Sequence, residues 1–366
     1  MTTLHDYYQQ FGQSIWLDFI SQDIINDGTL ARLIDLGLRG VTSNPTIFDK
    51  AISGSHAYDD LLAQLVASGA DTFAIYDELS RRDVAAAADA FRPLYEASEG
   101  GDGFVSIEVS PDLAYDTEGT IAEAKRLWTT LNRPNIMIKV PATAEGIPAI
   151  RQLISEGVNV NATLMFSLQD YDNVAFAYIE GLEQRVARGE DPSRVASVAS
   201  FFVSRIDTAV DKQLAAKGVT DLQGKIAIAN AKLAYRRFQQ VFSGPRWDAL
   251  AAKGARVQRP LWASTSTKNP AYSDVLYVDN LIGPHTVNTL PLHTIEAALD
   301  HGALARTVDR DVEEAEAMIA RLADYGIDFD QITADLQTAG VKSFADSFHS
   351  LLNTIAQRAS ALQPAG

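Results

Sequence analysis

Three ionisable residues interrupt apolar segments. Burying a charged side chain in such a segment costs free energy unless the charge is paired, so these residues call for a structural or functional explanation. They are Lys139, Asp18 and Glu108. Burial favours the neutral form of a lysine amine, and a neutral amine is a nucleophile that can attack a ketone to form an imine. Two nearby carboxylates would supply the proton transfers that imine formation and carbon–carbon cleavage require.

Each of these residues also has a purely structural interpretation. The stem of Lys139 could pack in the segment while its amine reaches water. Asp18 and Glu108 could form interior ion pairs or cap helices. A lysine and two carboxylates on three such segments nevertheless form a complete nucleophile and acid–base set. We therefore predict a catalytic site.

Two asparagines also lie in or at the end of apolar segments. Asn44 precedes Pro45, and Asn161 begins an Asn-Ala-Thr sequence that ends at Thr163. Asn-Ala-Thr is nominally a glycosylation signal, but here it lies in an apolar strand of a chain that shows no export signal. We interpret both asparagines as hydrogen-bonding groups that face a polar ligand.

Short apolar segments rich in β-branched residues alternate with helical stretches. The predicted strands are Ile15–Ile20, Gly40–Asn44, Phe104–Ser110, Ile136–Ala142, Val158–Phe166, Val195–Phe202, Pro260–Thr265 and Thr286–Pro291. The clearest predicted helices between them are Asp71–Glu96, Thr117–Leu131, Pro148–Glu156, Asp170–Arg188 and Asp221–Phe242. This alternation predicts parallel strands joined by right-handed crossovers.

Polar residues fall at or near the C-terminal ends of most of these strands. They are Asp18, Asn44, Glu108, Lys139, Asn161, Thr163, Ser200, Ser264 and Thr289. A doubly wound sheet would concentrate its chemistry at one switch point, whereas a barrel builds its site from the ends of several strands. We therefore predict the α/β class and a (β/α)₈ TIM barrel.

More helix follows the last strand than one closing helix requires. Helical patterns cover Val312–Tyr325, Phe329–Thr338 and Val341–Leu362, with junctions at Tyr325–Ile327 and at Ala339–Gly340. We predict one barrel domain over residues 1–366, in which residues 292–366 form additional C-terminal helices packed on the barrel.

The composition narrows the range of functions. Lys plus Arg number 31 and Asp plus Glu number 47, so a net charge of −16 argues against nucleic-acid partners and anionic membranes.

No cysteine is present, and the six histidines show no metal-like clustering. Phosphate-loop, dinucleotide-binding and His-Glu-x-x-His motifs are missing. No leader or membrane-spanning pattern is evident. Hydride transfer, nucleotide hydrolysis and zinc catalysis therefore lose their usual sequence support, and we expect a cytoplasmic protein.

Two long motifs resemble the signatures of the transaldolase family. Gly40–Phe48 reads GVTSNPTIF, and Ile136–Thr143, which reads IMIKVPAT, resembles the signature around the Schiff-base lysine. Supporting matches are Trp16–Asp18, Ser106–Val109, Asn161–Leu164 and Ser200–Asp207, and the resemblance runs from about Ile15 to about Pro291. It implies an enzyme of the pentose phosphate pathway, of the class I Schiff-base aldolase superfamily.

The resemblance implies a reaction without metal or organic cofactor. Lys139 would attack the ketone of sedoheptulose 7-phosphate or fructose 6-phosphate, Glu108 would move protons through a water, and Asp18 would take the C4 hydroxyl proton. The protonated imine would then hold a dihydroxyacetone unit until glyceraldehyde 3-phosphate or erythrose 4-phosphate accepts it.

The resemblance also implies substrate-binding residues. Asn44 and Asn161 would hold the hydroxyls of the three-carbon unit, Thr163 would place the water, and Ser200 would touch the substrate. Arg205 and Lys268 are the predicted phosphate cations, since arginine suits bidentate phosphate binding. Lys268 stands where some relatives have arginine, and a solvated loop lysine is its alternative interpretation.

Two other functions remain as alternatives. One is a fructose-6-phosphate aldolase-type enzyme that releases free dihydroxyacetone, although such chains are much shorter. The other is a non-catalytic barrel that binds or regulates. The sequence does not determine the oligomeric state, for which a homodimer is one option.

Overall fold

The computed structural model describes residues 3–362, and a closed barrel of eight parallel strands in sequence order lies at its centre. The strands are β1 (Gln13–Leu17), β2 (Gly40–Val41), β3 (Phe104–Glu108), β4 (Ile136–Pro141), β5 (Val160–Met165), β6 (Ser197–Phe202), β7 (Arg259–Ala263) and β8 (Thr286–Leu290). Every predicted strand is present, with ends shifted by a few residues. The predicted (β/α)₈ barrel is therefore confirmed.

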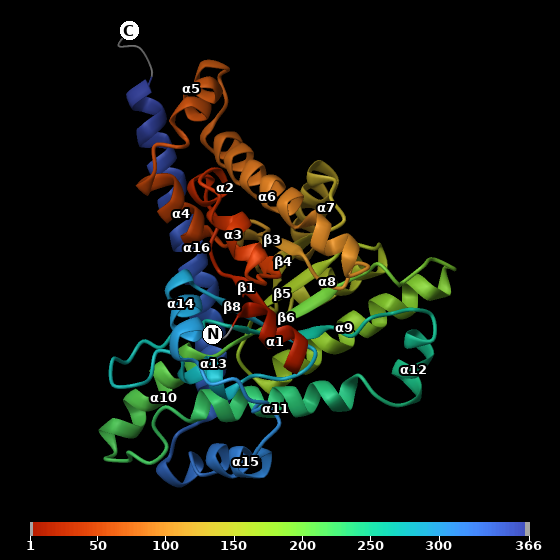
Figure 1. Ribbon diagram of the computed structural model, residues 1–366, viewed down its shortest axis with the longest axis vertical. Coiled ribbons are helices and arrows are strands. Elements are labelled where there is room, and N and C mark those ends of the chain that lie inside the picture. The colour runs from red at the N-terminus through yellow and green to blue at the C-terminus, as the bar shows by residue number, and fades with distance from the viewer. Residues whose placement is uncertain (1–2, 363–366) are drawn as a thin grey trace.

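Helices surround the barrel on its outer face (Figure 1). Those up to β4 are α1 (Leu4–Phe11), α2 (Gln22–Asn26), α3 (Thr29–Asp35), α4 (Pro45–Gly54), α5 (Asp59–Ala67), α6 (Thr72–Ala97), the 3₁₀ turn η1 (Pro111–Leu113) and α7 (Thr117–Leu131). Those between β4 and β8 are α8 (Gly146–Ser155), α9 (Leu168–Ala187), α10 (Ser204–Ala216), α11 (Ile226–Val241), α12 (Pro245–Ala251) and α13 (Leu276–Asn280). After β8 come α14 (Leu292–His301), α15 (Val312–Ala320), η2 (Ala323–Tyr325) and α16 (Phe329–Leu362).

Local sequence explains several helix boundaries. Asp71 and Asp116 accept backbone N–H groups at the starts of α6 and α7, and Ser167 forms a capping box at the start of α9. The prediction of α11 began too early because Gly224 has a φ of 70°, which no right-handed helix contains. Helix α8 begins before Pro148, because a proline is tolerated in the first turn of a helix.

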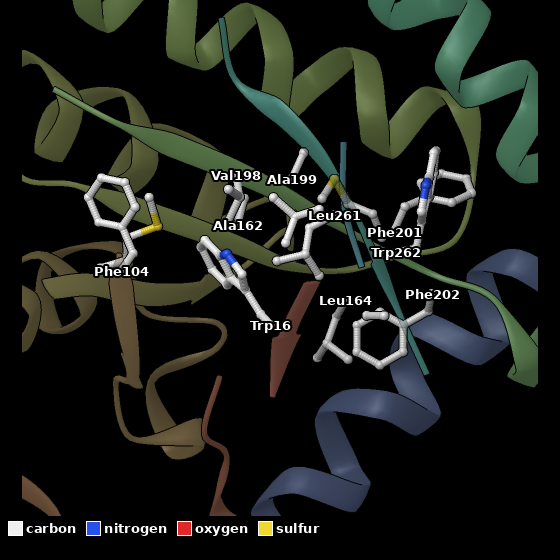
Figure 2. Close-up of a cluster of buried hydrophobic side chains, with 14 of the residues drawn as sticks. Trp16, Phe104, Ala162, Leu164, Val198, Ala199, Phe201, Phe202, Leu261 and Trp262 are labelled. Atoms are coloured by element: carbon white, nitrogen blue, oxygen red, sulfur yellow. The ribbon is translucent and has the colours of Figure 1, made fainter. Parts of the chain in front are cut away.

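Large side chains from several strands fill the core (Figure 2). Trp16 of β1 packs near Phe104 of β3, with ring centroids 6.4 Å apart, and its indole N–H donates to Asp102 at 3.0 Å. A Cβ atom on Gly40 would lie 2.6 Å from the Trp16 ring, so only glycine fits at the start of β2. Close packing of this core fixes the strand ends on which the site is built.

The C-terminal region differs from the prediction at Ala339–Gly340, where we expected a junction. Helix α16 instead continues unbroken from Phe329 to Leu362 and lies beside α4 (Figure 1). A Cβ atom on Gly340 would lie 2.9 Å from Leu164 Cδ2, so the glycine serves a close approach to β5 rather than a helix end. Tertiary packing here outweighs the low helix propensity of glycine.

Candidate active site

The C-terminal ends of the barrel strands surround a cavity of about 150 Å³. It is lined by Asp18, Thr42, Asn44, Lys139, Thr163, Ser200, Phe202, Arg205, Ala263, Ser264, Ser266, Lys268, Thr289, Pro291 and Phe344. The structure thus brings seven of the nine predicted site residues to the wall of one cavity. Glu108 and Asn161 lie behind that wall.

Lys139 sits in β4 with its side chain 6% exposed. Its Nζ donates to the backbone oxygen of Ser43 at 2.9 Å and lies 3.3 Å from Glu108 Oε2. Strand register explains this grouping, since Lys139 is the pairing partner of Glu108 on β3 and of Asn161 on β5. The amine therefore has a carboxylate beside it and a cavity in front of it.

Asp18 directly follows β1 and stands at the cavity wall. The Thr42 hydroxyl donates to Asp18 Oδ1 at 2.7 Å and lies 2.6 Å from the Thr289 hydroxyl. Burial raises the pKa of the Asp18 carboxyl, while the Thr42 hydrogen bond and the cations of Lys139 and Lys268 oppose the rise. A carboxylate with a raised pKa is suited to accept a proton near neutral pH.

Glu108 is 6% exposed at the end of β3. Burial raises the pKa of its carboxyl, the Lys139 amine opposes the rise, and the Asp18 charge adds to it. Neither Glu108 oxygen has a directed hydrogen bond within residues 3–362, and the same holds for the buried Thr163 hydroxyl. These groups retain the capacity to exchange protons or to bind a small polar molecule.

The backbone bends where Thr163 reaches the cavity. Leu164 has a φ of 62°, a left-handed conformation that is rare for a branched side chain, and the pairing of β5 with β6 shifts between Ala162 and Met165. Ser264, at the end of β7, has a φ of 57°. Such backbone strain is characteristic of functional sites.

The two predicted asparagines have different surroundings. Asn44 lines the cavity, and its Oδ1 accepts the Ile47 N–H at 3.0 Å, which caps helix α4. Asn161 is fully buried, donates to Ser106 at 3.1 Å and accepts from Ser200 at 2.7 Å. Its amide thus holds Ser200, which is itself on the cavity wall.

Two of the residues that line the cavity, Arg205 and Lys268, are cations. Lys268 donates to the Ser266 hydroxyl at 2.7 Å, and Arg205 makes no ion pair with any residue between 3 and 362. Burial lowers the pKa of both groups, and for Lys268 the Arg205 charge contributes further. Both residues also line a second, adjoining space of about 580 Å³, which we call the outer vestibule. Lys50 and His293 line this vestibule as well. An anion bound here would relieve the repulsion between the cations.

Phe344 of α16 is one of the cavity residues that the sequence did not indicate, and it comes from far outside the barrel strands. Its ring centroid lies 5.7 Å from Lys139 Nζ and 6.0 Å from the Arg205 guanidinium carbon. Phe344 fits the ordinary apolar pattern of an amphipathic helix, so no local signal distinguishes it from a core residue.

Residues 3–362 contain neither a metal-binding group of side chains nor a membrane-spanning helix. No group of three or more His, Asp or Glu side chains among them is arranged to hold a metal ion. None of their helices combines the length and the apolar character needed to cross a membrane.

Known proteins resemble this chain over nearly its whole length. Residues 15–355 match the family described as Transaldolase/Fructose-6-phosphate aldolase. The transaldolase of Trichodesmium erythraeum is 48% identical over 97% of each chain. That of Acidothermus cellulolyticus is 52% identical over 93% of this chain and 92% of its own, and that of Saccharopolyspora erythraea is 50% identical over 95% of each. The similarity extends from β1 into α16.

Proposed function

This chain belongs to the transaldolase and fructose-6-phosphate aldolase family and is a transaldolase, and we propose that Lys139 is its Schiff-base nucleophile. The observation that carries this assignment is the position of the Lys139 amine, which is buried, faces the cavity and lies 3.3 Å from Glu108. A buried lysine beside an acid–base group is what imine chemistry with a ketone requires.

The proposed reaction begins when Lys139 attacks the C2 ketone of the donor sugar. Glu108 moves protons so that the carbinolamine loses water and becomes an imine. Asp18 then removes the C4 hydroxyl proton, the C3–C4 bond breaks, and an aldose phosphate leaves. The protonated imine takes up the electron pair, which leaves an enamine of dihydroxyacetone on Lys139. An acceptor aldehyde reverses these steps.

The remaining roles that we propose concern binding. Asn44 and Ser200 hold hydroxyl groups of the three-carbon unit, and Thr163 orients the water that Glu108 uses. The Asn161 amide is already hydrogen-bonded to Ser106 and Ser200, so it contacts the substrate only if hydrogen bonds to the substrate replace these two. Arg205 and Lys268 bind the phosphate, for which the support is their position as two neighbouring cations on the cavity wall.

Sedoheptulose 7-phosphate and fructose 6-phosphate are the proposed donors, and glyceraldehyde 3-phosphate and erythrose 4-phosphate the proposed acceptors, within the pentose phosphate pathway. A cytoplasmic location agrees with phosphorylated sugar substrates. A homodimer is the assembly to test, by light scattering on the purified protein.

Borohydride reduction in the presence of fructose 6-phosphate tests the nucleophile. We expect mass mapping to find a dihydroxyacetone-derived adduct on the peptide that contains Lys139. Lys232 is the internal control, because it is also buried but donates to the Arg310 backbone oxygen away from the cavity. An adduct on another lysine, or none at all, would overturn the assignment.

A second assay separates transfer from simple cleavage. Fructose 6-phosphate should be cleaved in sustained turnover only when an acceptor aldose phosphate is present. Equally fast release of free dihydroxyacetone without acceptor would instead assign the chain to the aldolase branch of its family.

A further inference from the structure

Phe344 lies at the boundary between the inner cavity and the outer vestibule. It lines both spaces, is 5% exposed, and its ring is 5.7 Å from the Lys139 amine. The ring also faces Arg205 at 6.0 Å. An apolar surface therefore borders the position at which the lysine-bound substrate would be formed.

Contacts of α16 with the barrel fix the position of Phe344. Two turns before it, Gln337 donates to the backbone oxygens of Ala142 at 3.1 Å and of Leu164 at 3.2 Å, just beyond β4 and within β5. One turn before it, Gly340 allows the helix to approach Leu164 closely. The helix is thus attached to the strand that carries Lys139 and to the neighbouring strand that carries Thr163.

The enamine on Lys139 has two possible fates, which differ in what reacts at its C3 carbon. In transfer, C3 bonds to the aldehyde carbon of the acceptor and the aldehyde oxygen takes a proton. In the competing reaction, C3 takes a proton from solvent. Both routes then end by the same step, in which water adds to C2 and the bond from C2 to the lysine nitrogen breaks. The competing reaction therefore releases dihydroxyacetone, and neither route consumes water overall, because formation of the first imine released one water.

We infer that Phe344 determines reaction specificity by keeping bulk solvent away from C3 of the lysine-bound enamine. This inference rests on the proposed transaldolase function. The shielding depends on the apolar volume of the side chain at the cavity mouth, since exclusion of water suppresses side reactions of reactive intermediates. Phe344 then acts in the same way for every donor sugar, because the three-carbon unit is common to all of them.

Three variants test this inference. Phe344→Ala removes the shield, and Phe344→Leu keeps most of the apolar volume without the aromatic ring. Phe348→Ala is the matched control, because Phe348 is also buried on α16 but packs on Tyr76, with ring centroids 5.2 Å apart, and does not line the cavity. Thermal unfolding reports any general loss of stability.

The measured quantity is the ratio of dihydroxyacetone release without acceptor to transfer with acceptor, both from fructose 6-phosphate. This ratio does not depend on the folded fraction, because the same folded molecules carry out both reactions. We expect Phe344→Ala to raise it by about tenfold, which is a modest change in relative barrier height. Phe344→Leu and Phe348→Ala should stay close to the unmodified enzyme.

Three results would overturn the inference. They are an unchanged ratio in Phe344→Ala, an equal rise in Phe348→Ala, or a rise in Phe344→Leu as large as that in Phe344→Ala. The unmodified enzyme tests the proposed function separately. If it already releases dihydroxyacetone without acceptor as fast as it transfers it, the transaldolase assignment fails, whatever the variants do.

Discussion

Asp18 and Glu108 are both carboxylates whose pKa burial raises, but they occupy different places around Lys139. Asp18 is on the cavity wall and is held by the Thr42 hydroxyl, whereas Glu108 lies behind the wall in contact with the amine. Their positions suit a division of labour, in which Asp18 acts on a substrate hydroxyl and Glu108 acts at the lysine nitrogen.

We predict that Asp18→Asn and Glu108→Gln block different steps. Asparagine can keep the hydrogen bond to Thr42 but cannot take a proton, so cleavage should slow by about 10²–10⁴-fold. Borohydride should then trap the intact six-carbon sugar on Lys139 rather than the three-carbon unit. Glu108→Gln should slow the appearance of either adduct. Rapid formation of the three-carbon adduct in Asp18→Asn would contradict the role of Asp18.

Lys268 offers a second test at the residue scale. Lys268→Gln should raise the KM for fructose 6-phosphate by about 10–100-fold, because charge-assisted hydrogen bonds contribute roughly 1.5–3 kcal/mol. Little change in kcat is expected. Lys253→Gln removes the same charge from an exposed position and serves as the control. Equal KM values for the two variants would show that Lys268 does not bind the phosphate and is a solvated loop lysine.

At the scale of elements, α16 connects the strand ends to the outer helices. Besides its attachment to β4 and β5 through Gln337, its Ser347 hydroxyl accepts a hydrogen bond from Thr46 of α4 at 2.8 Å. Helix α4 itself begins at Asn44 on the cavity wall. The helix therefore joins two parts of the site that are distant in sequence.

Gly340 is the position at which this packing is most sensitive. We predict that Gly340→Val lowers the free energy of unfolding by about 1–3 kcal/mol, because the added methyl groups overpack the contact with Leu164. Ala339→Val places the same side chain on the exposed face of the same turn and should cost about 0.5 kcal/mol. Urea unfolding measures both, and similar losses would show that α16 does not need a glycine here.

At the scale of the whole molecule, the chain carries a net charge of −16, yet its cavity contains the cations Lys139, Arg205 and Lys268. This separation should attract phosphorylated sugars to one face only. That residues 1–366 form a single domain, with residues 292–366 packed on the barrel, stays a prediction. It implies one cooperative unfolding transition.

Buried acids outside the site shape the pH dependence of stability. Asp207 accepts the Ala227 N–H at 2.8 Å and the Tyr277 hydroxyl at 2.9 Å, so it joins α10 to α11 and α13. Burial raises its pKa from 3.8 to about 7. Between these pH values the folded protein binds the proton more tightly than the unfolded chain, so the contribution of Asp207 to stability falls as the pH rises from about 4 to about 7.

Asp207→Asn should remove this fall, because the amide keeps the shape and cannot ionise. We predict that the free energy of unfolding of the variant, relative to the unmodified protein, improves between pH 5 and pH 8 in urea titrations. Asp324→Asn, at an exposed position, should show no such trend. A constant difference for Asp207→Asn would mean that Asp207 is already ionised at pH 5.

The order and approximate ends of the eight strands could be predicted from the amino-acid sequence alone. The sequence also predicted that Lys139 and two carboxylates lie at or near the C-terminal ends of strands. These features are local, because apolar periodicity, helix caps and an embedded charge can be recognised within a few residues. The parallel barrel then follows from strand–helix alternation, and it brings the strand ends together.

The surroundings of these residues, in contrast, follow from how distant segments of the chain pack together. The tertiary structure directs the Asn161 amide to Ser106 and Ser200, carries α16 without a break through Gly340, and places Phe344 beside Lys139. Each of these results depends on contacts between segments far apart in the chain. No local pattern encodes such contacts, because they follow from how the helices and strands pack against one another.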